Sequence, residues 1–199
     1  PQSDYAMFQK SLIAGVKSSS EKIKTLNALL KQYPKSNMVP DVNMEIALTY
    51  IADEKFNEAV PYLSTLISSA EAGGLRPKAY LKLGLCYYNM NRNTEALDNY
   101  QALIQKYPQS AEADEAMDIM KNIYVETGRP NDYIEMMRKN GKNISVSEAD
   151  SLTYTSAELK YNAADCNAAI AGFKNYLSQY PNGSYALEAN YFSSECYLK

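Results

Sequence analysis

The chain has 199 residues, 46% of them hydrophobic and 22% charged, which suits a globular protein with one long domain or two small ones. Its net charge of −3 provides no basic field for nucleic acid, and the absence of histidine excludes Ser–His and Cys–His nucleophiles and histidine-ligated metals within the chain. No apolar run is long enough to cross a bilayer. We therefore predict no nucleic-acid partner, no cofactor, no metal site and no transmembrane segment in this stretch.

Apolar periodicity, capping boxes and prolines together predict a chain made of helices, without strands. The capping boxes Ser18-x-x-Glu21 and Ser145-x-x-Glu148 mark two helix starts. Pro108 marks a helix end, because the residue before a proline is pushed out of the helical region. In chain order, the predicted helices span residues 3–16, 19–33, 41–53, 56–71, 77–90, 93–107, 111–127, 130–139, 147–162, 166–180 and 184–198.

The sequence repeats itself with a period of about 36 residues, within the range of helical repeats. Tyr33-Pro34-Lys35-Ser36 recurs 74 residues later as Tyr107-Pro108-Gln109-Ser110, and a further 73 residues on as Tyr180-Pro181-Asn182-Gly183-Ser184. Each separation equals two units. A helix pair of this length cannot bury its own apolar face and must stack on its neighbours. We therefore predict an all-α fold, an α-solenoid of stacked antiparallel helix pairs.

The third unit, residues 77–110, carries the clearest pattern. It reads Tyr80-x-x-Leu83-Gly84-x-x-Tyr87, then Ala96-x-x-x-Tyr100, then Pro108. This segment resembles a tetratricopeptide repeat, in which the corresponding pattern is W-x-x-L-G-x-x-Y, A-x-x-x-F and P. Gly84 lacks a Cβ and so allows a neighbouring helix to approach closely. The resemblance implies a right-handed superhelix built from such units.

The other units match this pattern less closely. Lys121 and Tyr133 stand where small residues are expected in the fourth unit, and Thr153, Ser156 and Lys160 are poor matches in the fifth. We nevertheless predict a single array over residues 1–199, part of a longer repeat protein. Its units lie at about 3–36, 40–73, 77–110, 114–147 and 150–183, with a half unit at 187–199. The half unit has no second helix, so its apolar face is a candidate surface for self-association.

The family resemblance implies that the first helix of each pair lines a concave face on which partners bind. The predicted groove residues are Met44, Leu48, Ile51, Leu81, Leu85, Tyr88, Asn122, Tyr154, Glu158 and Tyr161. The apolar N-terminal half suits an amphipathic helix or an extended apolar segment. The C-terminal half alternates carboxylates with tyrosines and suits a basic or polar segment. The same apolar stripe suits internal packing equally well, and a run of carboxylates also suits a solvated helix face.

These observations favour a non-catalytic scaffold that binds a protein or peptide of unknown identity. The alternative from another class is a glycan-binding helical module in which tyrosines stack on sugar rings, although the absence of tryptophan argues against it. It would require three or more exposed tyrosines in one pocket. Catalysis by two carboxyl groups would require an acid pair in one cleft, one of them with a raised pKa.

The three cysteines, Cys86, Cys166 and Cys196, are odd in number and form no C-x-x-C motif, so the sequence predicts no disulfide framework. Cys86 and Cys196 lie three units apart, too far to bridge, and we expect both to be buried. We expect Cys166, at a turn between helices, to be a partly exposed thiol. The Tyr-Pro-x-Ser helix ending resembles the tetratricopeptide lipoproteins and division-associated proteins of the Gram-negative periplasm. This resemblance implies a periplasmic or outer-membrane-associated protein, with the cytoplasm as the alternative.

Overall fold

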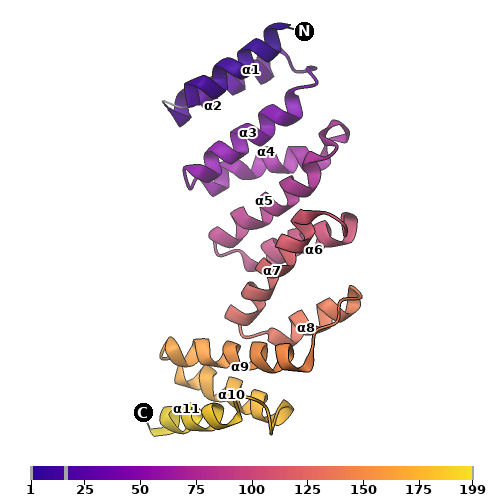
Figure 1. The fold of residues 1–199 in the computed structure, drawn as a ribbon. Coiled ribbons are helices and arrows are strands. Elements are labelled where there is room, and N and C mark those ends of the chain that lie inside the picture. Colours follow the sequence, from indigo (N-terminus) through magenta and orange to yellow (C-terminus); the bar gives the residue numbers. More distant parts are fainter. Residues whose placement is uncertain (1, 16–17, 199) are drawn as a thin grey trace. The chain divides into compact units, whose positions relative to one another are not determined.

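The structure, a computed structural model, describes residues 2–15 and 18–198, which form eleven α-helices and one short 3-10 helix and contain no strand (Figure 1). The helices are α1 (Gln2–Gly15), α2 (Ser19–Gln32), α3 (Val39–Ala52), α4 (Phe56–Ser68), α5 (Leu75–Asn89), α6 (Asn93–Lys106), α7 (Ala111–Glu126), α8 (Pro130–Lys139), α9 (Val146–Asn162), α10 (Cys166–Gln179) and α11 (Ala186–Leu198), and the 3-10 helix is η1 (Ala70–Ala72).

The predicted helices are confirmed, and their ends differ from the observed ones by at most three residues. The predicted end of the first helix, residue 16, lies outside the described residues. The largest difference is at the end of α4, which stops at Ser68 instead of continuing to residue 71. Ser69 has an extended backbone, and its hydroxyl accepts a hydrogen bond from the Glu71 amide at 3.2 Å. A serine side chain that satisfies a nearby amide in this way competes with the helix, so the chain leaves α4 and forms η1.

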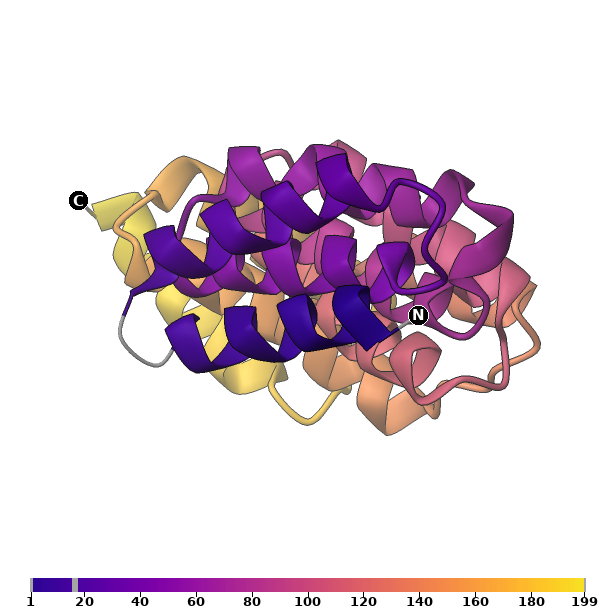
Figure 2. The ribbon, with the colours of Figure 1, turned by 90° about the horizontal axis from the view of Figure 1, so that it is seen from above.

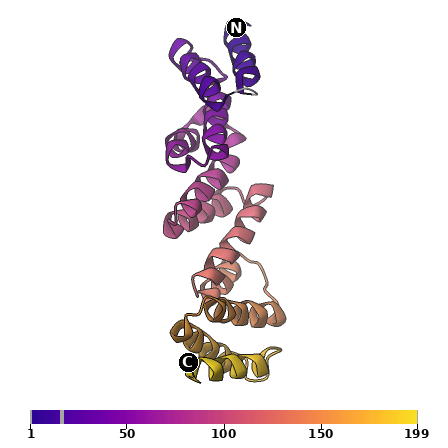
Figure 3. The same cartoon turned by 90° about the vertical axis from the view of Figure 1, so that its left-hand side faces the viewer.

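The chain divides into two compact units, residues 1–117 and 118–199, and α7 runs through the boundary. In the first unit, α1 pairs with α2, α3 with α4, and α5 with α6, while α2 and α4 also contact the first helix of the next pair. Figure 2 shows the antiparallel course of α1 and α2. In the second unit, α10 lies between α9 and α11, and α8 contacts α9 (Figure 3).

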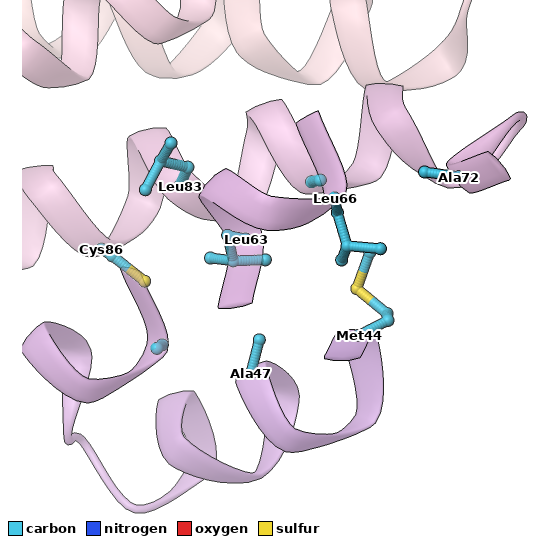
Figure 4. Close-up of a cluster of buried hydrophobic side chains, with 9 residues drawn as sticks. Met44, Ala47, Leu63, Leu66, Ala72, Leu83 and Cys86 are labelled. Atoms are coloured by element: carbon cyan, nitrogen blue, oxygen red, sulfur yellow. The ribbon is translucent and has the colours of Figure 1, made fainter. Parts of the chain in front are cut away.

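Apolar side chains between α3, α4 and α5 form the main core of the first unit. Leu63 and Leu66 of α4 are fully buried there, and Met44 of α3 and Leu83 of α5 meet them from either side (Figure 4). The approach of α6 to α5 depends on Gly84, because a Cβ at this position would overlap the ring of Tyr100. The small residue in the tetratricopeptide-like pattern therefore has the packing role that the sequence predicts.

The core of the second unit is aromatic. Tyr154 of α9 lies 5.9 Å from the ring of Phe173 and 5.7 Å from that of Tyr176, both on α10, and its ring stacks on Tyr185 at 4.5 Å. Gly172 permits this packing, because a Cβ there would come within 2.8 Å of the Ala157 Cβ. The close contact of a small residue with the facing helix thus occurs in the fifth repeat unit as well as in the third.

The poor matches to the repeat pattern in α9 have a structural explanation. The Ser156 hydroxyl donates to the carbonyl of Val125 at 2.8 Å, and the Lys160 ammonium donates to the carbonyl of Glu126 at 2.7 Å. Both carbonyls belong to the last turn of α7, where backbone acceptors have no partner within the helix. Polar residues at these positions of α9 therefore cap α7 instead of filling volume.

The repeated Tyr-Pro-x-Ser motif connects one helix pair to the next. Its tyrosine ends α2, α6 and α10. The Ser36 hydroxyl donates to Asp4 of α1 at 2.6 Å, and the Ser184 amide donates to Asp150 of α9 at 2.8 Å. In the first and the fifth repeat units, a carboxylate on the first helix of the pair therefore binds the connector that follows the second helix.

The expectation that the chain has no disulfide is wrong. Cys166 and Cys196 form a disulfide with a Cα–Cα distance of 5.1 Å. Cys166 is the first residue of α10, and Cys196 lies in the last turn of α11, so antiparallel packing of these two helices brings the cysteines together. Cys86 is a buried free thiol, as predicted, and burial raises its pKa to about 11.

Candidate partner-binding surface

The predicted groove residues of the first unit lie on α3 and α5, which contact each other. Met44 and Leu81 are buried, with exposed fractions of 4% and 2%, so they support this surface from within. The other four are half-buried and reach the surface: Leu48, Ile51, Leu85 and Tyr88. Leu48 and Ile51 also pack against the core between α3 and α5. This stripe therefore contributes to internal packing and to the surface at once.

In the second unit, the predicted groove residues of α9 are joined to α11. The Tyr154 hydroxyl donates to Glu158 at 2.9 Å, while the Tyr154 ring is buried in the aromatic core. The Tyr161 hydroxyl donates to Glu195 of α11, and the Tyr161 ring lies 4.6 Å from Phe192. These contacts place a tyrosine and two carboxylates side by side across α9 and α11.

We call the set Glu158, Tyr161, Glu188, Tyr191 and Glu195 the tyrosine–carboxylate surface. Glu188 and Tyr191 are exposed on α11, and the other three residues are half-buried. The hydrogen bond to Glu195 raises the pKa of Tyr161. Among the described residues, no lysine or arginine forms an ion pair with any of the three glutamates. The surface is therefore negatively charged and uncompensated.

The remaining predicted groove residue, Asn122, is exposed on α7. It lies on the second unit's part of that helix, one residue after Lys121, which pairs with Asp118 at 3.5 Å. It is therefore not one of the residues that α9 and α11 bring together. Its assignment to the groove stays a prediction.

The repeat pattern does not single out two aromatic residues that shape this region. Tyr185 stacks on Tyr154, and Phe192 contacts both Tyr161 and Tyr191, the latter at 5.4 Å. Phe192 lies two positions after the start of the repeat pattern in the half unit, a slot to which the pattern assigns no residue type. Its place on the side of α11 that faces α9 could have been found from helical periodicity alone.

A hollow of about 390 Å³ lies elsewhere in the second unit, against α9 and α10. Small residues line most of it, including Ala168, Ala171 and Gly172 of α10. Lys160 is the titratable side chain in its lining, and its ammonium is already bound to the Glu126 carbonyl. The hollow therefore offers space without an acid–base pair.

Four carboxyl groups of the residues that the structure describes have a pKa that is shifted, and in each case it lies below the usual value of the group. Hydrogen bonds lower the pKa of Asp4, of Glu71 and of Glu95. Burial opposes ionisation of Asp150, but hydrogen bonds from Tyr176 and Ser184 outweigh it and lower the pKa of this carboxyl also. A carboxyl group that acts as a general acid needs a raised pKa.

The described part of the chain offers neither a metal site nor a membrane span. Within residues 2–15 and 18–198, no cluster of three or more His, Cys, Asp or Glu side chains could hold a metal ion. In the same ranges, no helix combines the length and apolarity that a membrane crossing requires.

Comparison with known proteins supports the assignment of the third unit. Residues 78–110, which include α5 from its fourth residue onward and all of α6, match the family described as tetratricopeptide repeat. This match confirms the resemblance found at residues 77–110. No curated protein is significantly similar to the chain in sequence.

The fold is similar to that of a solved tetratricopeptide repeat protein. A tetratricopeptide repeat protein from Parabacteroides merdae aligns with a TM-score of 0.59 at 14% identity, covering 100% of this chain and 73% of that chain. A thermophilic protein of the same class from Thermus thermophilus aligns with a TM-score of 0.48 at 14% identity, covering 99% of this chain and 100% of that chain. The first similarity confirms the predicted fold class, an all-α array of stacked helix pairs. The right-handed superhelical course stays a prediction.

Proposed function

We propose that the chain is a non-catalytic scaffold that binds a protein segment on the face formed by the first helices of its pairs. The observation that carries the proposal is the uncompensated charge of the tyrosine–carboxylate surface on α9 and α11. Tetratricopeptide repeats generally mediate contacts between proteins, and residues 78–110 match such a repeat. The partner that best suits this surface is a segment rich in lysine and arginine.

The chemistry of the surface favours cationic side chains in two ways. Glu158, Glu188 and Glu195 attract them electrostatically, and because these carboxylates form no ion pair among the described residues, none is lost when a partner binds. The ring of Tyr191, which is 61% exposed, offers a face for a lysine or arginine side chain. Because exposed charges are screened by salt, binding should weaken as ionic strength rises.

The half-buried apolar residues of the first unit support a second contact. Leu48, Leu85 and Tyr88 present partial apolar surface on the adjacent helices α3 and α5. A separate apolar segment of the partner would bury this surface. We propose that the apolar contact adds affinity and that the charged contact sets selectivity.

A peptide titration tests the proposal. We expect a lysine- and arginine-rich peptide to bind at low salt, and a peptide of equal length with glutamine at the basic positions to bind far more weakly. The double variant Glu158→Gln/Glu188→Gln should weaken binding about tenfold, which corresponds to about 1.4 kcal/mol for two partly exposed charges. The measurement is fluorescence anisotropy at two salt concentrations.

The matched control is Glu135→Gln, which removes an exposed carboxylate of α8 that pairs with Lys139 at 2.7 Å, outside the tyrosine–carboxylate surface. This variant should bind like the original chain. Equal binding by the double variant, or equal binding of both peptides, would refute the proposal.

The glycan-binding alternative receives no support from the tyrosines of this region. Tyr154 is buried, and Tyr161 and Tyr185 are half-buried in contacts with neighbouring aromatic rings. Tyr191 is thus the exposed ring among these four tyrosines, and the other exposed tyrosine of α11, Tyr197, has no ring contact with them among the described residues. Three exposed tyrosines in one pocket would be needed for stacking on sugars.

We propose that the protein works in an oxidising compartment outside the cytoplasm, such as the Gram-negative periplasm, in association with the outer membrane. The Cys166–Cys196 disulfide supports this location, because disulfides persist in such compartments and are rare in the cytosol. Thiol labelling tests this location. Cells are lysed directly into denaturant that contains an alkylating reagent, so that every free thiol is modified before disulfides exchange, and the modified cysteines are identified by mass spectrometry. We expect one modified cysteine, Cys86, whereas three modified cysteines would indicate the cytoplasm.

A further inference from the structure

Helix α11 is held to its unit by fewer fully buried side chains than α10, although the half-buried ring of Phe192 packs on Tyr161 and Phe173. Two of its residues, Ala189 and Cys196, are buried. By contrast, the helix that it packs against, α10, is fixed by the fully buried rings of Phe173 and Tyr176. The contacts of α11 are thus weaker than those that fix α10 on α9.

The disulfide adds a covalent link at the far end of α11. Cys196 lies in its last turn, and Cys166 begins α10, so the bond ties the end of the weakly packed helix to the start of the firmly packed one. A cross-link between residues 30 positions apart removes much of the freedom that α11 would gain by detaching.

We propose that the Cys166–Cys196 disulfide is a redox-sensitive clamp, whose reduction releases α11 while α9 and α10 stay folded. Cys166 is half-buried and Cys196 is buried, so a reductant reaches the bond from the side of Cys166.

The reaction is a thiol–disulfide exchange with a dithiol reductant. One thiolate of the reductant attacks the Cys166 sulfur, and the Cys196 sulfur leaves as a thiolate and takes up a proton. The second thiol of the reductant then attacks the mixed disulfide, which frees Cys166 as a thiol. In total, the bond between the two cysteines accepts two electrons and two protons, and the reductant becomes a disulfide.

Release of α11 would dismantle the tyrosine–carboxylate surface. Glu188, Tyr191 and Glu195 lie on α11, and the Tyr161–Glu195 hydrogen bond joins them to α9. Control of partner binding by the clamp rests on the function proposed above, whereas release of the helix does not.

Hydrogen exchange followed by mass spectrometry, with and without dithiothreitol, tests the clamp. Reduction should speed the exchange of amides in residues 186–198 by on the order of a hundredfold, the effect of losing a loop closure of this size. Amides in residues 169–179 of α10 should change by less than about threefold. Unchanged exchange in α11 would overturn the proposal, and so would an equal loss of protection in α9 and α10.

The double variant Cys166→Ala/Cys196→Ala provides the control. Without reductant it should exchange like the reduced chain, and dithiothreitol should then have no further effect on α11. A further response of this variant to dithiothreitol would contradict the assignment to the disulfide.

Peptide binding to the oxidised and reduced chains separates this proposal from the function. If reduction releases α11 but the basic peptide binds neither form, the clamp is supported and the proposed function fails. If the peptide binds both forms equally although α11 is released, the clamp does not control binding and that part of the proposal is overturned.

Discussion

Tyr100 stands where the tetratricopeptide pattern has phenylalanine, from which it differs by one hydroxyl group. The side chain is fully buried between α5 and α6, and the hydroxyl has no hydrogen-bond partner among the described residues. A buried hydroxyl without a partner costs free energy, while the ring itself fills space beside Gly84.

We therefore expect Tyr100→Phe to raise the free energy of unfolding by about 1 kcal/mol. Urea denaturation measures the change. The matched control is Tyr176→Phe, because the Tyr176 hydroxyl accepts a hydrogen bond from the Tyr185 amide at 3.0 Å. That variant should lose stability. A loss of stability in Tyr100→Phe as well would show that its hydroxyl has a partner.

The carboxyl group of Asp150 makes the free energy of unfolding depend on pH. In the folded chain, burial raises the pKa of this carboxyl, but hydrogen bonds lower it by more. In the unfolded chain the same group has a pKa of about 3.9. The stabilisation that it contributes is therefore complete above about pH 5, and is lost as the pH falls through the folded-state pKa.

The variant Asp150→Asn tests this linkage. The difference in unfolding free energy between the original chain and the variant should be largest at pH 7, and should shrink as the pH falls below about 4. Urea denaturation at a series of pH values measures it. A difference that stays constant from pH 7 to pH 3 would show that the charge of Asp150 has no such role.

At the scale of helices, the close approach of α5 and α6 depends on a single glycine. In Gly84→Ala, the added Cβ would overlap the Tyr100 ring and push the helices apart. The cost of overpacking, about 2–3 kcal/mol, exceeds the gain of about 1 kcal/mol in helix propensity. We expect a net loss of about 1–2 kcal/mol in thermal or urea unfolding.

Gly74→Ala is the matched control, because a Cβ at Gly74 would meet no atom within 4 Å and the backbone there is already helical. It should be neutral or slightly stabilising. If both alanine variants behaved alike, the close contact at Gly84 would be irrelevant to stability.

Helix positions could be predicted well because the signals are local. Pro108 and Pro181 follow helix ends, and the serines at 18 and 145 begin helices by accepting the amides that the sequence pattern assigns to them. The packing of α9 could not be predicted in this way. Ser156 stabilises it through a carbonyl 31 residues earlier, and a repeat pattern tests side-chain size but not such bonds.

The cysteine pairing depends on which helices become neighbours. Cys86 and Cys196 occupy the same slot of different units, and equal slots in a repeat array lie far apart. The pair that forms, Cys166 and Cys196, occupies opposite ends of two neighbouring antiparallel helices. The predicted helix ranges 166–180 and 184–198 already contained this signal, because antiparallel packing places the start of one helix beside the end of the other.

At the scale of the whole molecule, the repeat predicts the order and pairing of the helices better than it predicts which of their side chains reach the surface. Of the ten predicted groove residues, Met44, Leu81 and Tyr154 are buried. Burial depends on what the neighbouring helix presents, such as the ring of Tyr185 on Tyr154. A single helix sequence contains no information about that neighbour.

The most direct test of the central claim is an NMR titration of the ¹⁵N-labelled chain with the basic peptide at low salt. We predict that the amide resonances of Glu158, Tyr161, Tyr191 and Glu195 shift with a common binding curve, and that those of Ala168 and Ala171 beside the hollow on α10 do not. Shifts confined to the hollow, or no shifts on α9 and α11 at saturating peptide, would contradict a binding surface on these helices.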